Sequence, residues 1–128
     1  MFWRKKDKSI GEQGEDWAVK YLKKKKFKII ERNYQNKIGR RLGEIDIVAE
    51  KEGEIIFVEV KTRAIQLGKI VLPEENITRQ KLHKLQKIAR DYIREKNLWE
   101  KPYRFDAVSI VLKGDKVEEI RHLESIFY

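Results

Sequence analysis

Residues 43–63 read GEIDIVAEKEGEIIFVEVKTR, and this stretch decides the fold. Apolar residues alternate with charged ones on both sides of the central KEGE at residues 51–54. Such alternation predicts two β-strands joined by a tight turn, because successive side chains of a strand point to opposite faces. The sequence therefore predicts a β-hairpin with arms at residues 45–49 and 55–62.

The length of the turn decides which residues of the two arms face one another. With a two-residue or a four-residue turn, Asp46 lies directly opposite Glu59, and Glu44 lies opposite Lys61. A three-residue turn would make these contacts diagonal. Lys61 shares a strand face with Glu59, since the two are two positions apart. We therefore expect Asp46, Glu59 and Lys61 to form one cluster.

This cluster has two interpretations. Two carboxylates facing each other across a half-buried hairpin repel, and a divalent cation between them removes that repulsion. An all-oxygen site favours Mg²⁺ or Mn²⁺ over zinc. Alternatively, the acids are solvated residues on the polar face of an edge hairpin, and Lys61 neutralises them through salt bridges.

A helix preceding the hairpin adds a further carboxylate. Ser9 and Glu12 form a capping-box pattern, and the apolar residues behind them recur at helical spacing, which predicts a helix at residues 10–26. Glu15 borders the apolar stripe of this helix. If the helix packs on the sheet, Glu15 points toward the hairpin acids; otherwise it reaches solvent or pairs with a lysine.

The remaining segments complete an α/β pattern. The predicted elements are a strand at residues 27–34, a polar loop at 36–43, a long connection near the site at 64–76, a helix at 78–96 with Thr78 as its N-cap, and strands at 104–112 and 116–120. A chain of 128 residues suits one domain. We predict a single α/β domain, with a mixed central sheet flanked by helices.

The charge of the chain is concentrated in one segment. Lys and Arg number 30 against 21 Asp and Glu, a net charge of +9. Residues 20–41 hold ten basic side chains and one acid, and residues 79–96 form a second basic segment. A basic domain of this kind favours a polyanionic partner, with nucleic acid as the leading class and a ribosomal or membrane surface as the rival. The lysines at 23–26 equally fit a solvated helix face.

Other features exclude several kinds of site. The chain has no cysteine, which removes disulfides, thiolate catalysis and cysteine-based metal centres. Any metal would need oxygen or histidine ligands. The apolar runs are short, and the first residues lack the pattern of a secretory signal. We expect a cytoplasmic protein without a membrane segment.

The hairpin acids also resemble a known signature. Asp46, followed about a dozen residues later by Glu59-Val60-Lys61, resembles the PD-(D/E)xK nuclease superfamily. The likeness extends to Gly14-Glu15, Arg32-Asn33, residues 43–46 and residues 57–63. This longer pattern is similar to the YraN-like family of uncharacterised bacterial proteins, which is assigned to that superfamily through its resemblance to archaeal Holliday junction resolvases. It covers about residues 11–111.

The resemblance implies a restriction-endonuclease-like core and a role for each motif residue. Asp46 and Glu59 would hold Mg²⁺ or Mn²⁺, Glu15 would support that ion or a second one, and Lys61 would orient or activate the attacking water. The chain departs from the pattern with Ile45 where a proline often stands, and it lacks the Gln-Xaa₃-Tyr helix motif, which argues against a RecB-type member.

The activity implied is hydrolysis of phosphodiester bonds in DNA. Selectivity for branched DNA and a homodimer that spans two duplex arms are left open by the sequence. A different class of function is a nucleic-acid-binding module of the same fold without turnover, and a third is a ribosome- or RNA-associated basic protein.

Several further side chains are candidates for binding phosphate. Arg63 shares the face of Lys61 if the strand continues, and Arg40 and Arg41 lie in the basic segment. Lys81 borders the apolar stripe of the second helix and fits either a phosphate contact or a solvated lysine.

Three residues outside the motif receive structural predictions. Asp106 alternates with apolar residues, which favours a structural acid, although the sequence names no partner for it. His83 and His122 are isolated and are predicted to be surface histidines.

Overall fold

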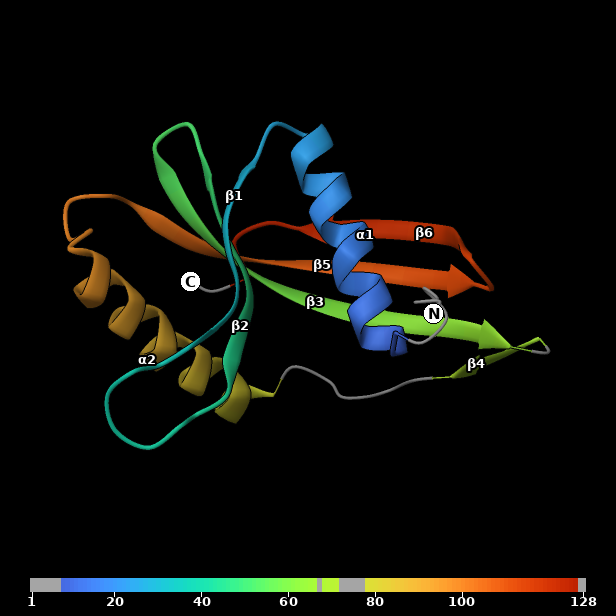
Figure 1. The fold of residues 1–128 in the computed structure, drawn as a ribbon, viewed down its shortest axis with the longest axis horizontal. Helices are drawn as coiled ribbons and strands as arrows, with labels where there is room; N and C mark the ends of the chain where they lie inside the picture. Colours follow the sequence, from blue (N-terminus) through green and yellow to red (C-terminus); the bar gives the residue numbers. More distant parts are fainter. Residues whose placement is uncertain (1–7, 67, 72–77, 127–128) are drawn as a thin grey trace, which may run out of the picture.

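A long strand, β3 (Glu54–Gln66), forms the centre of the computed structural model, which describes residues 8–66, 68–71 and 78–126 (Figure 1). The sheet order is β1-β2-β3-β5-β6, with β4 paired to the end of β3. The β3–β5 pair is parallel and the other pairs are antiparallel, so the sheet is mixed, as predicted. The other elements are α1 (Ile10–Lys24), β1 (Lys28–Gln35), β2 (Glu44–Lys51), β4 (Lys69–Val71), α2 (Arg79–Lys96), β5 (Tyr103–Lys113) and β6 (Lys116–Leu123).

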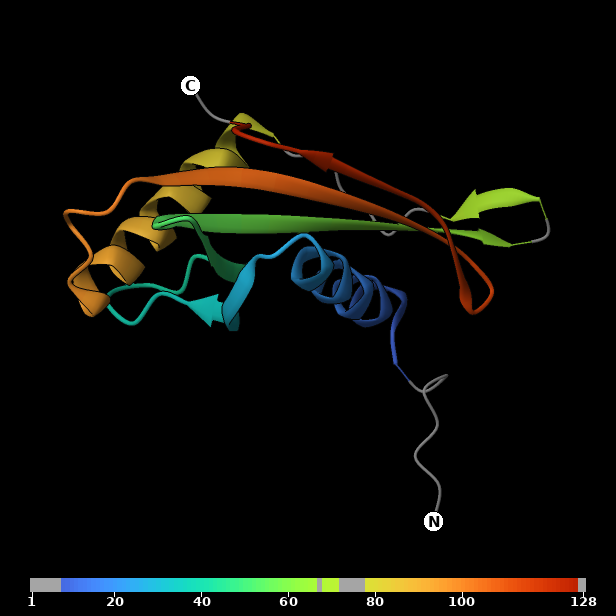
Figure 2. The same ribbon diagram turned by 90° about the horizontal axis from the view of Figure 1, so that it is seen from above.

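The two helices cover opposite faces of this sheet. Ile56 and Val58 of β3 pack in one buried cluster with α1, whereas Ile55 and Phe57 pack in another with α2. Because neighbouring side chains of a strand point to opposite faces, these clusters define an α1 side and an α2 side. In Figure 2, α1 lies below the long strands. The predicted α/β class with helices flanking the sheet is confirmed.

The hairpin of β2 and β3 has the expected register. Lys51 pairs with Glu54, and the ladder continues to Ile47 opposite Val58. Glu52 and Gly53 form the two-residue turn with φ values of 51° and 82°. Positive φ at both positions matches the twist of a hairpin, and glycine adopts it without steric cost.

Both helix starts are confirmed. The hydroxyl of Ser9 accepts a hydrogen bond from the N–H of Glu12, whose carboxylate accepts one from the Ser9 N–H. Thr78 caps α2 by accepting from the Lys81 N–H. The first helix ends at Lys24, two residues earlier than predicted, since Lys26 takes a left-handed conformation with φ of 75°.

The predicted irregular connection at residues 64–76 is wrong in its first part. Residues 64–66 continue β3, because the parallel neighbour β5 pairs with it as far as Ile65 opposite Lys113. Lys69–Val71 then returns as β4, antiparallel to the end of β3. Residues 72–77 of that segment lie outside the described residues.

Candidate active site

Asp46 lies where β2 and β3 separate. The last ladder pair is Ile47 with Val58, and one residue further on the Asp46 carboxylate accepts a hydrogen bond from the backbone N–H of Val60 at 2.8 Å. Ile47 packs on the α1 side of the sheet and Ile45 on the α2 side. Residues two apart in a regular strand share a face, so the alternation of β2 is interrupted at Asp46. The side chain thus replaces a ladder hydrogen bond at the divergence point.

The predicted pairing beyond this point is wrong in detail. Glu44 pairs with Gln35 of β1 rather than with Lys61, because β2 remains with β1 while it leaves β3. Asp46 and Glu59 are also not ladder partners, yet their carboxylates remain neighbours. Burial raises the pKa of Asp46 well above its usual value, and the charges of Glu59 and Glu15 raise it further.

Glu59 is the buried acid of this group. Its side chain points to the α2 side, and its Oε2 forms an ion pair with Lys81 Nζ of α2 at a distance of 2.9 Å. Its Oε1 is buried and has no hydrogen-bond partner among the described residues. Leaving a buried carboxylate oxygen without a partner is costly, so this atom marks a position for a cation, or for a proton that Glu59 shares with Asp46 through their side-chain hydrogen bond.

Glu15 reaches the same region from α1. The helix comes close to β3 because Gly14 has no side chain: a Cβ there would lie 1.9 Å from Thr62 Oγ1. Glu15 Oε1 accepts from Arg32 Nη2, and Glu15 Oε2 accepts from Asn33 Nδ2, each at 3.1 Å. The predicted inward orientation is therefore correct, with β1 supplying the immediate partners.

Asn33 is a further residue of the site, and its role is not apparent from the sequence. Its amide donates to both Glu15 Oε2 and Glu44 Oε1 at 3.1 Å, so it joins α1 to β2. Its backbone is left-handed, with φ of 54°, a conformation that asparagine tolerates better than most residues. The signal for it in the sequence is the Arg32-Asn33 pair, which belongs to the family resemblance.

Lys61 follows Glu59 on the α2 side of β3. It lines a pocket of about 270 Å³ together with Leu82, Ala107, Val108, Ser109, Leu123 and Ile126. No ion pair joins Lys61 to a described residue; the ammonium that neutralises Glu59 is that of Lys81. The alternative in which Lys61 bridges the hairpin acids is therefore not observed.

The other predicted phosphate ligands are spread over the surface. Arg63 is exposed on β3, and Arg40 and Arg41 are exposed on the loop between β1 and β2. The Asn36 side chain holds this loop by bonding to three of its backbone groups. Lys81 is tied to Glu59 and is not a freely solvated lysine.

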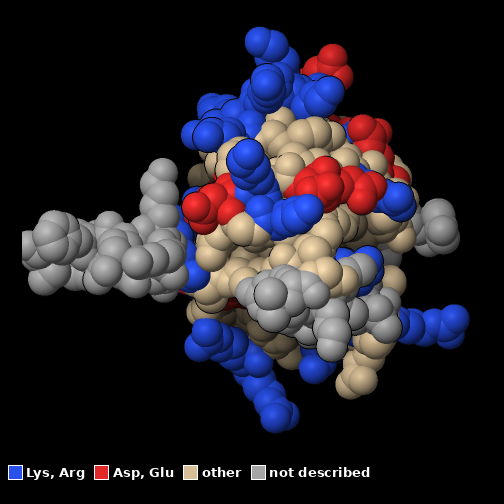
Figure 3. All heavy atoms as spheres, turned by 90° about the vertical axis from the view of Figure 1, so that its right-hand side faces the viewer, with Lys and Arg blue, Asp and Glu red and all other residues tan. Residues whose placement is uncertain are grey.

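The lysine run at residues 23–26 ends α1 and is exposed. Figure 3 shows Lys and Arg side chains gathered at the top of the molecule, where α1 ends in Figure 1, with acidic side chains beside and below them and further basic side chains at the lower edge. Positive charge is favourable there because the carbonyl end of a helix is partly negative.

None of the helices in the described part of the chain has the length and apolar character needed to span a membrane.

The expectation that His122 is a surface histidine is wrong, while the structural role of Asp106 is confirmed. Asp106 is fully buried and bonds to Arg104 at 2.9 Å, His122 Nε2 at 2.8 Å and the Ser125 N–H at 3.0 Å. His122 Nδ1 lies 3.0 Å from the Tyr21 hydroxyl. Burial alone would raise the pKa of Asp106, but the hydrogen bonds from His122 and Arg104 outweigh it, and the pKa is lowered.

The His122 side chain faces inward because β6 contains an irregularity. Counting forward along β6 from the turn at residues 114–115, a regular ladder would place His122 opposite Ala107, on the α2 side. A register shift at Val111/Leu112 places it opposite Val108, on the α1 side next to Tyr21. His83 is exposed, as predicted.

The fold and these side chains define the class of protein. It is a mixed α/β protein whose sheet and flanking helices are consistent with a restriction-endonuclease-like fold, and acids from α1, β2 and β3 converge where β2 and β3 separate. The chain belongs to the uncharacterised protein family UPF0102, whose model matches residues 14–110.

Relatives along nearly the whole chain support this membership. A UPF0102 protein from Geotalea uraniireducens is 40% identical over 124 residues, which are 97% of this chain and 93% of the relative. One from Fusobacterium nucleatum is 42% identical over 116 residues, 91% of each chain. The YraN-like resemblance is thereby confirmed at the level of the family.

Proposed function

We propose that the protein is a metal-dependent nuclease that hydrolyses phosphodiester bonds in DNA, as a member of the PD-(D/E)xK superfamily. The observation that carries the proposal is the buried, unpartnered Oε1 of Glu59 beside the carboxylate of Asp46. The two carboxylates repel each other, and one of their oxygens has no donor among the described residues. A bound cation would relieve both costs, whereas a purely structural role explains neither.

The donor set fits a hard divalent cation. No group of three or more His, Cys, Asp or Glu side chains within the described residues has the arrangement of a complete metal site. Mg²⁺ does not need one, because it keeps several waters and commonly binds one or two carboxylates together with substrate phosphate. Asp46 and Glu59 would hold Mg²⁺ or Mn²⁺, and Glu15 would support them from α1. The bound ion would neutralise charge developing on the phosphate and lower the pKa of a water.

The chain's own residues have separate tasks in this proposal. The Val60 N–H fixes the Asp46 carboxylate, and Arg32 and Asn33 fix Glu15. Lys61 would place its ammonium beside the attacking water or a phosphate oxygen, where positive charge stabilises the transition state. Arg63, Arg40 and Arg41 are the proposed contacts to more distant phosphates, whereas Lys81, which pairs with Glu59, would meet a phosphate only next to the metal site.

The test is incubation with a four-way junction, single-stranded DNA and duplex DNA in Mg²⁺ and in Mn²⁺. We expect the wild type to cleave at least one substrate, and Asp46→Asn to lose activity by about 100-fold or more, because a metal ligand contributes several kcal/mol to the transition state. Lys61→Ala should also lose cleavage. Asp115→Asn, the same change at an exposed turn, is the matched control and should cleave normally. A wild type that cuts nothing, or an Asp46→Asn variant that cuts equally well, refutes the proposal.

Metal binding can be tested without turnover. At a Mn²⁺ concentration 100 times the dissociation constant, the wild type should gain about 2.7 kcal/mol of stability. We expect Asp46→Asn to lose this gain and Asp115→Asn to keep it. Thermal unfolding with EDTA and with Mn²⁺ measures the difference, and equal gains in both variants would place the ion elsewhere.

A non-catalytic nucleic-acid-binding module is the second candidate. The ion pair between Lys81 and Glu59 favours it, because a carboxylate already neutralised by an ammonium has less need of a metal ion. In that case the wild type binds DNA in the same buffers but does not cut it and is not stabilised by Mn²⁺.

A further inference from the structure

Two pockets follow one another between α2 and β5, starting beside Lys61. The first is the pocket of Lys61, Leu82 and Ser109. The second has a volume of about 480 Å³ and is lined by Glu54, Gln86, Arg90, Tyr103, Arg104, Phe105 and Ser125. Leu82, Gln86 and Arg90 are four residues apart along α2, and the β5 side chains at 103, 105, 107 and 109 share one strand face. We call this surface the α2–β5 groove.

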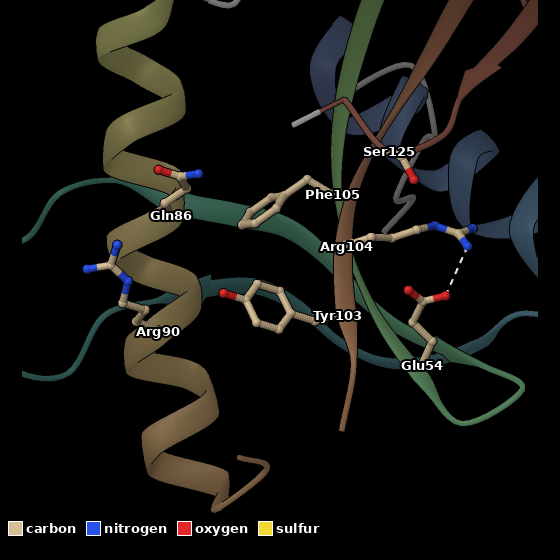
Figure 4. A pocket seen from close by; sticks show the side chains of 7 residues that line it. All are labelled: Glu54, Gln86, Arg90, Tyr103, Arg104, Phe105 and Ser125. Atoms are coloured by element: carbon tan, nitrogen blue, oxygen red, sulfur yellow. Dashed lines mark hydrogen bonds and ion pairs between the residues drawn. The ribbon is translucent and has the colours of Figure 1, made fainter. Parts of the chain in front are cut away.

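The second pocket presents an aromatic ring and a cation from opposite walls. Figure 4 shows Tyr103 and Phe105 extending from β5 toward α2, where Gln86 and Arg90 lie. Tyr103 is 45% exposed, and its ring makes edge-to-face contacts with Phe57 and Phe105 at centroid distances of 5.8 and 6.2 Å. These contacts hold the ring in place while much of its surface stays open.

The charges of the groove favour an anionic occupant. Arg90 is exposed, and it forms no ion pair with any described residue. Glu54, the acid in the lining, is bound by Arg104 Nη1 at 3.1 Å, on the other side of β5 from Tyr103. Arg104 is in turn bound to Asp106. The cation of the lining that pairs with no described acid is therefore Arg90.

We propose that the α2–β5 groove binds an unpaired segment of the DNA strand, with one base stacked on Tyr103 and a phosphate held by Arg90. This inference rests on the proposed nuclease function and specifies its substrate class. Aromatic rings together with cations bind single strands, because every base has a π-face that stacking can use. A duplex keeps its bases stacked on each other and cannot offer the face of a base to the Tyr103 ring.

The geometry also gives a position for the unpaired segment. Lys61 lies opposite Ser109 in the parallel β3–β5 ladder, and Tyr103 is six residues away along β5, roughly 20 Å. The stacked base would lie several nucleotides from the bond that is cut. A DNA with a single-stranded arm next to a duplex or a branch point meets this requirement, whereas a fully paired duplex does not.

The test measures binding in EDTA, so that it does not depend on cleavage. We expect the wild type to bind a fluorescent 12-nucleotide single strand more tightly than the duplex of the same sequence. Tyr103→Ala should weaken binding of the single strand by about 10-fold, and Tyr103→Phe should retain it, because stacking needs the ring and not the hydroxyl. Trp99→Ala, which removes an exposed ring outside the lining of the two pockets, is the matched control and should bind normally.

Arg90 has its own readout. Arg90→Ala should weaken binding of the single strand and reduce the slope of log affinity against log salt by roughly 0.7, the value for one lost phosphate contact on a single strand. Arg94→Ala, an exposed arginine one turn further along α2, should leave binding of the single strand and the slope nearly unchanged.

The outcomes separate this inference from the proposed function. If the wild type cleaves DNA but Tyr103→Ala and Arg90→Ala bind the single strand normally, the groove proposal fails and the nuclease proposal stands. If the wild type cleaves nothing while both variants lose single-strand binding, the nuclease proposal fails and the groove remains a binding site. A wild type that prefers the duplex overturns the groove proposal directly.

Discussion

Replacing Asp106 with alanine is expected to lower the free energy of unfolding by about 3–5 kcal/mol, the cost of removing one partner from a buried ion pair. The carboxylate is fully buried and accepts from Arg104, His122 and the Ser125 N–H. Without it, Arg104 and His122 lose an acceptor that lies at a fully buried position, where water does not readily replace it. Urea unfolding followed by tryptophan fluorescence measures the loss.

Two further variants make this prediction specific. Asp106→Asn keeps the shape but turns an NH₂ group toward donors, so it should be almost as destabilising as alanine. Glu118→Ala, at an exposed position of the neighbouring strand β6, should change stability by less than about 0.5 kcal/mol. A loss below about 1 kcal/mol for both Asp106 variants would show that the network contributes little.

Asp106 should also affect the acid sensitivity of the fold. Its pKa is lowered in the folded state, so the carboxylate stabilises the protein above its unfolded pKa of about 3.9, and this stabilisation is lost as the pH falls through the lower, folded value. Asp106→Asn removes this titration. The difference in stability between wild type and variant should therefore be largest near neutral pH and shrink below about pH 4.

The fold was predictable because its signals are local. Alternation in β2 and β3, the turn at Glu52 and Gly53 and the two N-caps each lie within a few residues of the structure they define. The continuation of β3 through residues 64–66 was missed because it depends on β5, which is more than 30 residues away in the chain. Pairing partners at such distances leave little trace in a local pattern.

The candidate site was predictable in its membership more than in its contacts. The pattern identified Asp46, Glu59 and Glu15, because acids beside buried positions are unusual wherever they occur. It could not show that β2 leaves β3 at Asp46, since the alternation is unchanged there. Nor could it show that Lys81 reaches Glu59, because that contact depends on how α2 docks on the sheet.

The second large effect on stability is expected at Gly14, where α1 packs closely against β3. A Cβ built there lies 1.9 Å from Thr62 Oγ1 and 2.7 Å from Thr62 Cβ. A change of rotamer can move Oγ1, but it cannot relieve the contact with Cβ, which is fixed to the backbone of β3. We expect Gly14→Val to lower the free energy of unfolding by about 3 kcal/mol or more, at the upper end of overpacking costs. The gain in helix propensity over glycine, under about 1 kcal/mol, offsets only part of this.

Gly11 supplies the matched control, because it lies in the same helix and a Cβ there meets only Ser9 Oγ, at 3.9 Å. Gly11→Val should therefore change stability by no more than about 0.5 kcal/mol, a value set by helix propensity alone.

In a double-mutant cycle, Thr62→Ala removes the two nearest atoms and should make Gly14→Ala less destabilising than it is in the wild type. Equal effects of valine at the two glycines would mean that α1 does not depend on close approach to β3. If valine destabilises only at Gly14, the close approach of α1 to β3 at Gly14 is what brings Glu15 near Asp46. Because Gly14→Ala would push α1 away from β3, it should then weaken Mn²⁺ binding even under conditions in which the protein remains folded.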